Sequence, residues 1–139
     1  MKSVKIYAVG KVKERNIQAL IDEYLKRLKV FAKVEIVELK DRGIGKESEE
    51  IAKLIDGKTY LLDELGPQFS SIAFSELIND NEEIKLIIGG ADGINGEVKA
   101  KAKLLSLSRM TFTHELARLI LAEQVYRAFM IINNRNYHK

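Results

Sequence analysis

The sequence predicts a single α/β domain over residues 1–139, built on an open, mostly parallel sheet, and three observations favour that fold class. Segments with the alternating pattern of a strand are followed, several times along the chain, by segments with the spacing of an amphipathic helix. One apolar run, Leu86–Ile88, has no polar interruption, as expected of a strand that is covered on both faces. The length of 139 residues, 46% of them hydrophobic, suits one compact domain.

The first part of the chain is predicted to contain a strand, a helix and a second strand. Val4, Ile6 and Ala8 alternate with polar neighbours, which is typical of a strand with one buried face. Apolar residues between positions 17 and 28 recur at helical spacing and form one stripe. The alternation returns over Lys33–Leu39, which predicts the second strand.

The middle of the chain continues this order of strands and helices. Residues 41–50 are polar and predict a mobile loop, which opens a helix over Ser48–Asp56 that ends at Gly57. Gly66 and Pro67 predict a turn. The other elements expected here are a third strand, a helix starting near Ser70 or Ser71, and a fourth strand: Thr59–Asp63, Phe69–Ile78 and Leu86–Ile88.

The last part of the chain joins a β-prone segment to an unusual helix. Leu104–Thr113 is short of charge and leads directly into a helical pattern over His114–Ile132. Apolar residues occupy most of the circumference of this helix, so it should be buried on several faces. In so small a chain, the second buried face is predicted to lie against a partner subunit in a homodimer. Glu123 and Arg127, four residues apart, could be an ordinary exposed ion pair.

Charge is distributed unevenly along the chain, although the formal net charge is only +3. Residues 1–34 carry nine Lys and Arg against three Asp and Glu, residues 35–98 carry six against fifteen, and residues 99–139 carry eight against two. If the fold brings the basic ends together, they form a positive face of the kind that binds a polyanion such as nucleic acid. The alternative is that these charged side chains only keep exposed helix surfaces hydrated and bind no partner.

Residue usage argues against several classes of protein and site. With no cysteine, the chain has no disulfide, no thiolate metal cluster and no thiol nucleophile. Its two histidines lack the spacing of a helical zinc site, so no metal is expected. The sequence contains no long apolar run and no secretory signal, so we expect a soluble, cytoplasmic protein with no membrane partner.

Glycines at positions 89, 90, 93 and 96 follow the fourth predicted strand in KLIIGGADGING. In an open parallel sheet, ligands bind beyond the carboxyl ends of the strands, where this loop is expected. Glycines let the backbone approach a flat ligand, so main-chain N–H and C=O groups become available for binding. The spacing G-G-x-x-G-x-x-G fits neither a dinucleotide fingerprint nor a P-loop. A glycine-rich turn without a ligand therefore stays open as an alternative.

Several motifs, in order along the chain, resemble those of one family. They are the glycine loop IIGGADG, the segment LSLSRMTFTH, the helix end LAEQVYRA and the terminal YH. With the start MKSVKIYAVGKVKE, they make the chain similar to the large-subunit ribosomal RNA methyltransferase H family over nearly its whole length. The resemblance implies a SPOUT-class homodimer with a C-terminal trefoil knot. It also implies methylation of N3 of a pseudouridine in the helix 69 hairpin loop of 23S rRNA, within the assembled 70S ribosome.

The resemblance further implies a binding site for the cofactor S-adenosylmethionine. Three neighbouring loops would wrap the adenosine, with backbone groups at the adenine edge and apolar side chains over its faces. The implied cofactor-binding residues are Leu62, Gly89, Gly90, Leu107, Ser108, Arg109, Met110, Thr111 and Phe112.

The chemistry of the acceptor suggests which side chains to consider as catalytic. An imide N–H is a poor nucleophile until it loses its proton, so a general base should help. A histidine in a terminal tail is usually a mobile surface residue, but in the family the terminal pair, here Tyr137 and His138, closes over the site. His138 is therefore the first candidate, His114 is the second, and Arg118 is assigned to the same catalytic group. Candidates for binding RNA phosphates are the arginines at positions 109, 118, 127 and 135.

The chain departs from the family pattern at two places, and two other functions stay open. Thr113 stands where the family usually has proline, and it can cap the last helix instead. The region around residues 40–58 is shorter than in many relatives. A non-catalytic RNA- or ribosome-binding α/β module would have no need of the glycine loop together with LSLSRMTFTH. A nucleotide-dependent oxidoreductase would need a glycine spacing that the chain lacks.

Overall fold

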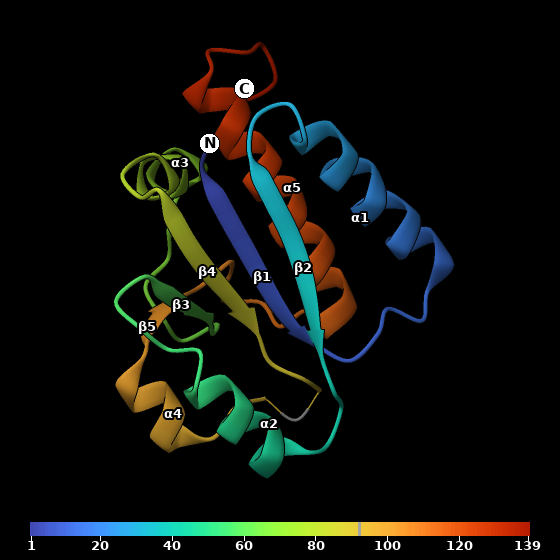
Figure 1. The fold of residues 1–139 in the computed structure, drawn as a ribbon, viewed down its shortest axis with the longest axis vertical. Helices are drawn as coiled ribbons and strands as arrows, with labels where there is room; N and C mark the ends of the chain where they lie inside the picture. The colour runs from blue at the N-terminus through green and yellow to red at the C-terminus, as the bar shows by residue number, and fades with distance from the viewer. Residues whose placement is uncertain (92) are drawn as a thin grey trace.

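Five parallel strands form one sheet in this computed structural model, which describes residues 1–91 and 93–139 (Figure 1). The order across the sheet is β2-β1-β4-β3-β5, and each of these neighbouring pairs is parallel. The predicted α/β class is confirmed, and the described sheet is wholly parallel. The strands are β1 (Ser3–Val9), β2 (Lys33–Leu39), β3 (Thr59–Leu62), β4 (Glu83–Ile88) and β5 (Lys103–Leu105).

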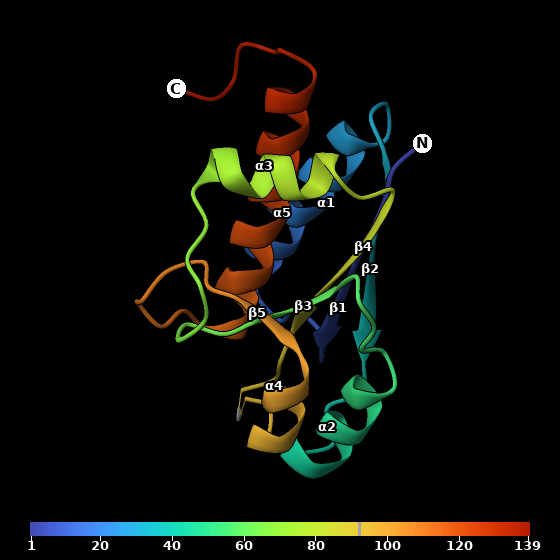
Figure 2. The same cartoon turned by 90° about the vertical axis from the view of Figure 1, so that its left-hand side faces the viewer.

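Helices cover one face of the sheet along its length and the other face only near the carboxyl ends of the strands (Figure 2). Those that the structure describes are α1 (Arg15–Leu28), α2 (Ile44–Ala52), α3 (Ser71–Asn79), α4 (Gly96–Lys101) and α5 (His114–Ile132). Helices α1, α3 and α5 pack on one face, around a core that includes Leu28, Phe74 and Phe129. Helices α2 and α4 cover the other face near the carboxyl ends of the strands, where Ile51 and Val98 are buried.

The sequence pattern explains which strand residues are buried. The alternating apolar residues of β1 face the core beneath α1, α3 and α5. In β4, Leu86 and Ile88 belong to that core, whereas Ile87 lies in the smaller core beneath α2 and α4. The uninterrupted apolar run of β4 is therefore buried on both faces, as predicted.

Helix α5 begins and ends where the sequence predicts, at His114 and Ile132. Thr113 is its N-cap, because its side-chain oxygen accepts a hydrogen bond from the Leu116 N–H at 3.3 Å. Helices α1 and α3 pack against α5, and the sheet covers it from a third side (Figures 1 and 2). Much of the apolar circumference of α5 is thus buried within its own chain.

One helix lies elsewhere than predicted. The sequence predicts this helix over Ser48–Asp56, after a mobile loop and before Gly57, but α2 covers Ile44–Ala52. Gly43 forms the N-cap with a φ of 89°, a conformation that glycine adopts easily. The Glu47 carboxylate accepts hydrogen bonds at 2.8 Å from the N–H of Gly43 and of the residue before it, which satisfies donors at the helix start. Glycine has a low helix propensity, so these first residues look like a loop in the sequence.

Shorter elements also differ from the predictions. Helix α4 is not predicted, because so short a helix shows no clear period in the sequence. Its N-cap Asn95 accepts a hydrogen bond from the Val98 N–H at 3.1 Å. Within the β-prone segment Leu104–Thr113, strand β5 ends at Leu105, and the rest adds only one bridge to the loop after β3. Strand β4 begins at Glu83, earlier than predicted.

Candidate functional site

A cleft of about 850 Å³ lies at the carboxyl ends of β3, β4 and β5. Its walls come from the loops that follow these strands and from the first turn of α5. Ligand sites of parallel α/β sheets lie at such edges, and pockets of this size hold small molecules and cofactors. The cleft is therefore the first candidate for a binding site.

Close packing explains Gly89 and Gly90, and backbone conformation explains Gly93. A Cβ atom on Gly89 would lie 2.8 Å from Cγ1 of Ile94, and a Cβ atom on Gly90 would lie 2.8 Å from Oε1 of Glu47. Gly93 has a φ of 80°, and its N–H donates to the carbonyl of Gly90 at 2.9 Å, which closes a tight turn. The loop therefore folds back on itself, and it forms one wall of the cleft.

Hydrogen bonds hold the segment after β5 against the loop after β3. The Arg109 guanidinium donates to the carbonyl oxygens of Glu64 and Gly66, the latter at 2.7 Å. The Thr111 hydroxyl donates to the Glu64 carboxylate at 2.5 Å, and the buried Ser106 hydroxyl donates to the Glu64 carbonyl at 3.1 Å. Two loops that are distant in sequence thus form a second, fixed wall of the cleft.

The cleft brings together most of the residues that the resemblance assigns to the cofactor. Arg109 is the exception, because its guanidinium binds the loop carbonyls and the residue is not part of the cleft lining. The other predicted cofactor-binding residues all line the cleft: Leu62, Gly89, Gly90, Leu107, Ser108, Met110, Thr111 and Phe112.

Carboxylates line the cleft as well, and the sequence analysis does not predict them. They are Glu14, Asp63, Glu64 and Glu115. Burial raises the pKa of Asp63, but a 2.7 Å ion pair with Lys99 and a hydrogen bond from the Leu65 N–H lower it, and the net shift is downward. A hydrogen bond from the Glu14 N–H lowers the pKa of Glu115. Asp63 and Glu64 directly follow β3, so the rule that ligands bind at strand ends would have identified these two.

Arg118 lies below the surface, with 2% of its area exposed. Its guanidinium forms a 2.6 Å ion pair with Glu38 and donates to the Gly10 carbonyl at 3.0 Å, so it joins α5 to the ends of β1 and β2. Its Nε has no hydrogen-bond partner among the described residues. Arg118 is not part of the cleft lining, so any effect on a reaction there has to act through these contacts.

The C-terminal tail folds back onto α5. Tyr137 packs edge-on against Tyr126, with ring centroids 4.9 Å apart, and its hydroxyl donates to Oε1 of Glu123 at 3.3 Å. Burial raises the pKa of Tyr137 to about 12. Nη1 of Arg127 lies 3.1 Å from Nδ1 of His138. The side chains of Arg127 and Glu123 form a 2.7 Å ion pair and are 24% and 19% exposed, so this pair anchors the tail and is not an ordinary exposed pair.

The tail and the cleft lie at different ends of α5. His138 contacts Arg127, near the end of the helix, whereas His114 lines the cleft at its first turn. With a rise of about 1.5 Å per residue, Arg127 and His114 are about 20 Å apart along the helix axis. Within one chain, the cleft therefore contains His114 but neither Tyr137 nor His138.

In residues 1–91 and 93–139, no three His, Cys, Asp or Glu side chains are grouped so that they could hold a metal ion. No helix in the part of the chain that the structure describes is long and apolar enough to cross a membrane.

Comparisons with known proteins find relatives over the whole chain. The family model described as "Predicted SPOUT methyltransferase" matches residues 1–138. The chain is 42% identical to "Ribosomal RNA large subunit methyltransferase H" of Malacoplasma penetrans, over 98% of this chain and 99% of that protein. Proteins of the same name from Thermodesulfovibrio yellowstonii and Streptococcus gordonii are 44% and 40% identical, over 96% and 98% of this chain and 97% and 99% of theirs. The residues matched by the family model include the cleft and the tail residues Tyr137 and His138.

Proposed function

Because the chain belongs to the SPOUT methyltransferase family, we propose that it methylates N3 of a pseudouridine in the helix 69 hairpin loop of 23S rRNA in the assembled ribosome. The names of its relatives support a large-subunit rRNA substrate. The observation that carries the proposal is the cleft beyond β3, β4 and β5, whose lining combines glycine backbone, apolar side chains and carboxylates. Unpaired bases of a hairpin loop can be turned into such a cleft more cheaply than stacked ones.

The lining of the cleft fits S-adenosylmethionine. Leu62, Leu107 and Phe112 offer apolar surface for the faces of an adenine ring, and the backbone of Gly89 and Gly90 offers hydrogen-bonding groups for its edge. The sulfonium and the amino group of this cofactor are cationic. The lining carries four carboxylates and one lysine, Lys99, which already pairs with Asp63, so its net charge favours such cationic groups.

The residues of the cleft have to position two reactants rather than perform difficult covalent chemistry. S-adenosylmethionine, when bound, supplies an electrophilic methyl group. The chain must hold the acceptor nitrogen in line with that group. Such positioning supplies a large part of the lowering of the activation barrier in reactions between two bound reactants. Arg109 keeps the wall between Glu64 and Gly66 rigid through its hydrogen bonds, so it acts as a positioning residue.

The acceptor nitrogen also has to lose its proton, and the two candidate bases lie at different places. His114 lines the cleft of its own chain, whereas His138 is about 20 Å away along α5. We therefore propose a homodimer in which Tyr137 and His138 of one protomer complete the cleft of the other. Arg127 orients the His138 ring from its own protomer.

Exposed apolar side chains at the cleft support this homodimer. Leu65 and Met110 line the cleft and are 81% and 74% exposed. Leu116, in the first turn of α5, is 40% exposed. Large apolar side chains gathered in the open are typical of a surface that another protein covers.

A trefoil knot is part of the same proposal. The supporting contacts are the parallel bridge between Gln68 and Ser106 and the hydrogen bonds from Arg109 and Thr111 to Glu64. They bind the segment before α5 tightly to the loop after β3. A chain threaded at this point would keep the walls of the cleft from separating, and such threading is rare in proteins.

Mass spectrometry of rRNA tests the proposed reaction. Purified 70S ribosomes and free 50S subunits are each incubated with the protein and S-adenosylmethionine carrying an isotopically labelled methyl group. We expect one labelled methyl group on a pseudouridine of 23S rRNA, with 70S ribosomes as the better substrate. A protein that binds ribosomes but transfers no label, and that shows no heat of binding with S-adenosylmethionine, would instead be a non-catalytic ribosome-binding module.

A further inference from the structure

The arginines that the sequence suggests for RNA phosphates are already engaged within the chain. Arg109, Arg118 and Arg127 form hydrogen bonds or ion pairs with the loop carbonyls, Glu38 and Glu123. Arg135 lies over the ring of Phe31, with its guanidinium carbon 5.7 Å from the ring centroid. Arg109, Arg118 and Arg127 have to give up hydrogen bonds or ion pairs before they can bind a phosphate in the usual two-pronged manner. Arg135 keeps its N–H donors, but it follows the end of α5, far from the cleft, so RNA backbone at the cleft needs other cations.

Five other cations lie on two adjacent loops beside the cleft. Lys11 and Lys13 follow β1 and Arg15 begins α1, whereas Lys40 and Arg42 follow β2. All five are exposed, and their side chains form no ion pair with any other residue that the structure describes. We call these five residues the basic rim.

Hydrogen bonds place the basic rim at the same edge of the molecule as the cleft. The Gly10 N–H donates to the Leu39 carbonyl at 2.8 Å, which joins the two loops where they leave the sheet. The N–H groups of Lys13 and Glu14 donate to the Glu115 carboxylate at 3.1 and 3.0 Å, which attaches the first loop to α5. Glu14 and Glu115 both line the cleft. The rim thus borders the entrance that a nucleotide would use.

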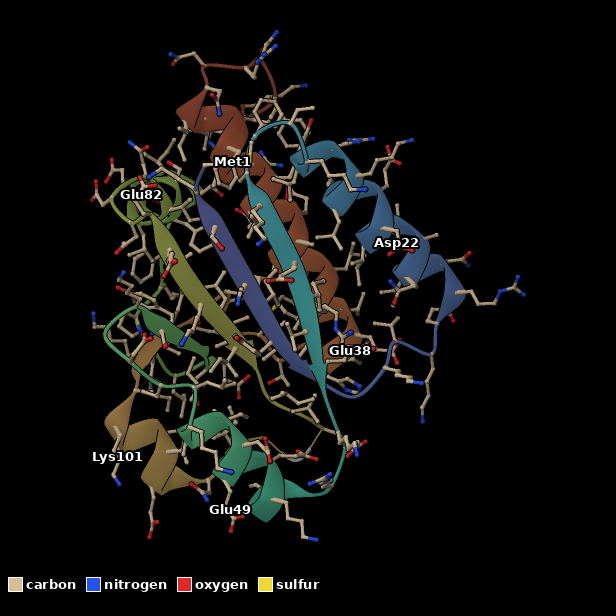
Figure 3. The ribbon with its side chains drawn as sticks, in the orientation of Figure 1. Met1, Asp22, Glu38, Glu49, Glu82 and Lys101 are labelled. Carbon is tan, nitrogen blue, oxygen red and sulfur yellow. The ribbon has the colours of Figure 1, made fainter. Side chains whose placement is uncertain are left out.

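Cations outnumber carboxylates on the two loops that form the basic rim. Residues 10–15 and 40–43 carry five cations against two carboxylates. Residues 76–83, at the α3–β4 connection, carry four carboxylates and no Lys or Arg. Figure 3 shows Glu82 at that end of the sheet and Glu38 at the cleft end. The opposite edge also carries Lys2, which pairs with Glu82, and the exposed Lys26, Lys29 and Lys33, so its charges are mixed, whereas the cations of the basic rim lie together beside the cleft.

We propose that the basic rim binds the phosphate backbone of the RNA that carries the target nucleotide and so presents that nucleotide to the cleft. This inference rests on the proposed function. Three of the five residues are lysines, which are mobile point charges suited to backbone contacts. Such contacts fix the position of the nucleic acid, while recognition of the base is left to the cleft.

Two matched triple variants test the rim. One replaces Lys11, Lys13 and Arg15 with glutamine; the other makes the same change at Lys26, Lys29 and Lys33, three exposed cations at the far end of α1 and the start of β2. Both remove the same charge. Binding of each protein to 70S ribosomes is measured across a range of salt concentrations, together with KM and kcat for methyl transfer and the affinity for S-adenosylmethionine.

The rim variant should bind ribosomes at least about tenfold more weakly near physiological salt, and the slope of log affinity against log salt should fall by about 2 to 3. Its KM should rise while its affinity for S-adenosylmethionine stays unchanged, which also shows that it is folded. The control variant should bind like the wild type. A second rim variant, Lys40→Gln with Arg42→Gln, should reduce the slope by about 1 to 2.

Equal affinities and slopes for the rim and control variants would overturn the inference. A weaker affinity with an unchanged salt slope would also overturn it, because it would indicate a contact to a ribosomal protein rather than to phosphates. Failure of the proposed function would look different: the wild-type protein would bind ribosomes with a steep salt dependence but transfer no methyl group to 23S rRNA.

Discussion

At the scale of single residues, the role of a side chain, or of a glycine that lacks one, depends on the atoms that surround it in the fold. The sequence shows that glycines follow β4. It does not show that a side chain at Gly89 would collide with Ile94. The sequence likewise suggests a catalytic or phosphate-binding role for Arg118, yet it cannot show that Glu38 and the Gly10 carbonyl surround the guanidinium. Contacts between residues so distant in sequence follow from the fold and from no local pattern.

Gly89 provides a first prediction. Gly89→Val should weaken the binding of S-adenosylmethionine at least about tenfold and lower the free energy of unfolding by about 1–3 kcal/mol, because the added atoms meet Ile94 and displace the loop. Calorimetric titration and denaturant unfolding measure the two effects. Gly96→Ala is the matched control, since a Cβ there has no neighbour within 4 Å. An unchanged affinity for Gly89→Val would exclude the glycine loop from the site.

The ion pair of Arg118 provides a second prediction. Glu38→Gln should lower the free energy of unfolding by about 1–2 kcal/mol, because it leaves a buried guanidinium without its counter-ion; the 39% exposure of the Glu38 side chain keeps the loss below that of a fully buried pair. Glu23→Gln, which breaks the exposed pair with Arg27, should change it by less than about 0.5 kcal/mol. Urea unfolding compares the two. Equal losses would mean that Arg118 does not brace α5 against the sheet.

At the scale of elements, the length and regularity of a pattern decide how well it predicts structure. The bounds of α5 follow from its sequence because a long run of helix-favouring residues follows Thr113, which supplies a cap. Helix α4 has six residues, too few for a period. Helix α2 begins at glycines that normally indicate a loop, and its start depends on the Glu47 carboxylate, which no propensity reports. The contacts of the tail with α5 are equally invisible to local patterns.

The tail provides a third prediction, for the dependence of stability on pH. Burial raises the pKa of Tyr137 from 10.0 to about 12, so the folded protein keeps a proton that the unfolded chain loses. The stability that this group contributes is complete below about pH 10 and is lost as the pH rises toward 12. Tyr137→Phe should therefore make urea-unfolding free energies fall less steeply than in the wild type over this range. Identical slopes would mean that the tail is not docked on α5 in solution.

At the scale of the whole molecule, the main separation is between the cleft and the tail. The sequence suggests residues from both for one site, and the structure places them about 20 Å apart along α5. The chain threading and the dimer follow from the family resemblance, because neither periodicity nor glycine spacing reports them. The uneven charge of the sequence suggests a positive face formed by the basic ends; α1 does pack against α5, but Arg118 and Arg127 of α5 are ion-paired, and the structure is needed to tell such engaged cations from exposed ones.

A homodimer with shared sites provides a fourth prediction. A variant lacking residues 137–139 keeps its cleft but has no tail, whereas Gly89→Val keeps its tail but has a damaged cleft. Neither homodimer should therefore methylate ribosomes. The truncated protein should still bind S-adenosylmethionine normally. Co-expressed together, they form heterodimers in which one site is complete. Methyl transfer to 70S ribosomes should then reappear. If native mass spectrometry detects the heterodimers but they have no activity, the tail of one protomer does not complete the cleft of the other.

The most direct measurement is a crystal structure of the protein grown with S-adenosylmethionine. The adenosine should lie between the loops that follow β3, β4 and β5, in contact with Leu62, the backbone of Gly89 and Leu107. Density for the cofactor at any other place, or crystals and calorimetry that both show no binding, would contradict the assignment of this cleft as the site of methyl transfer.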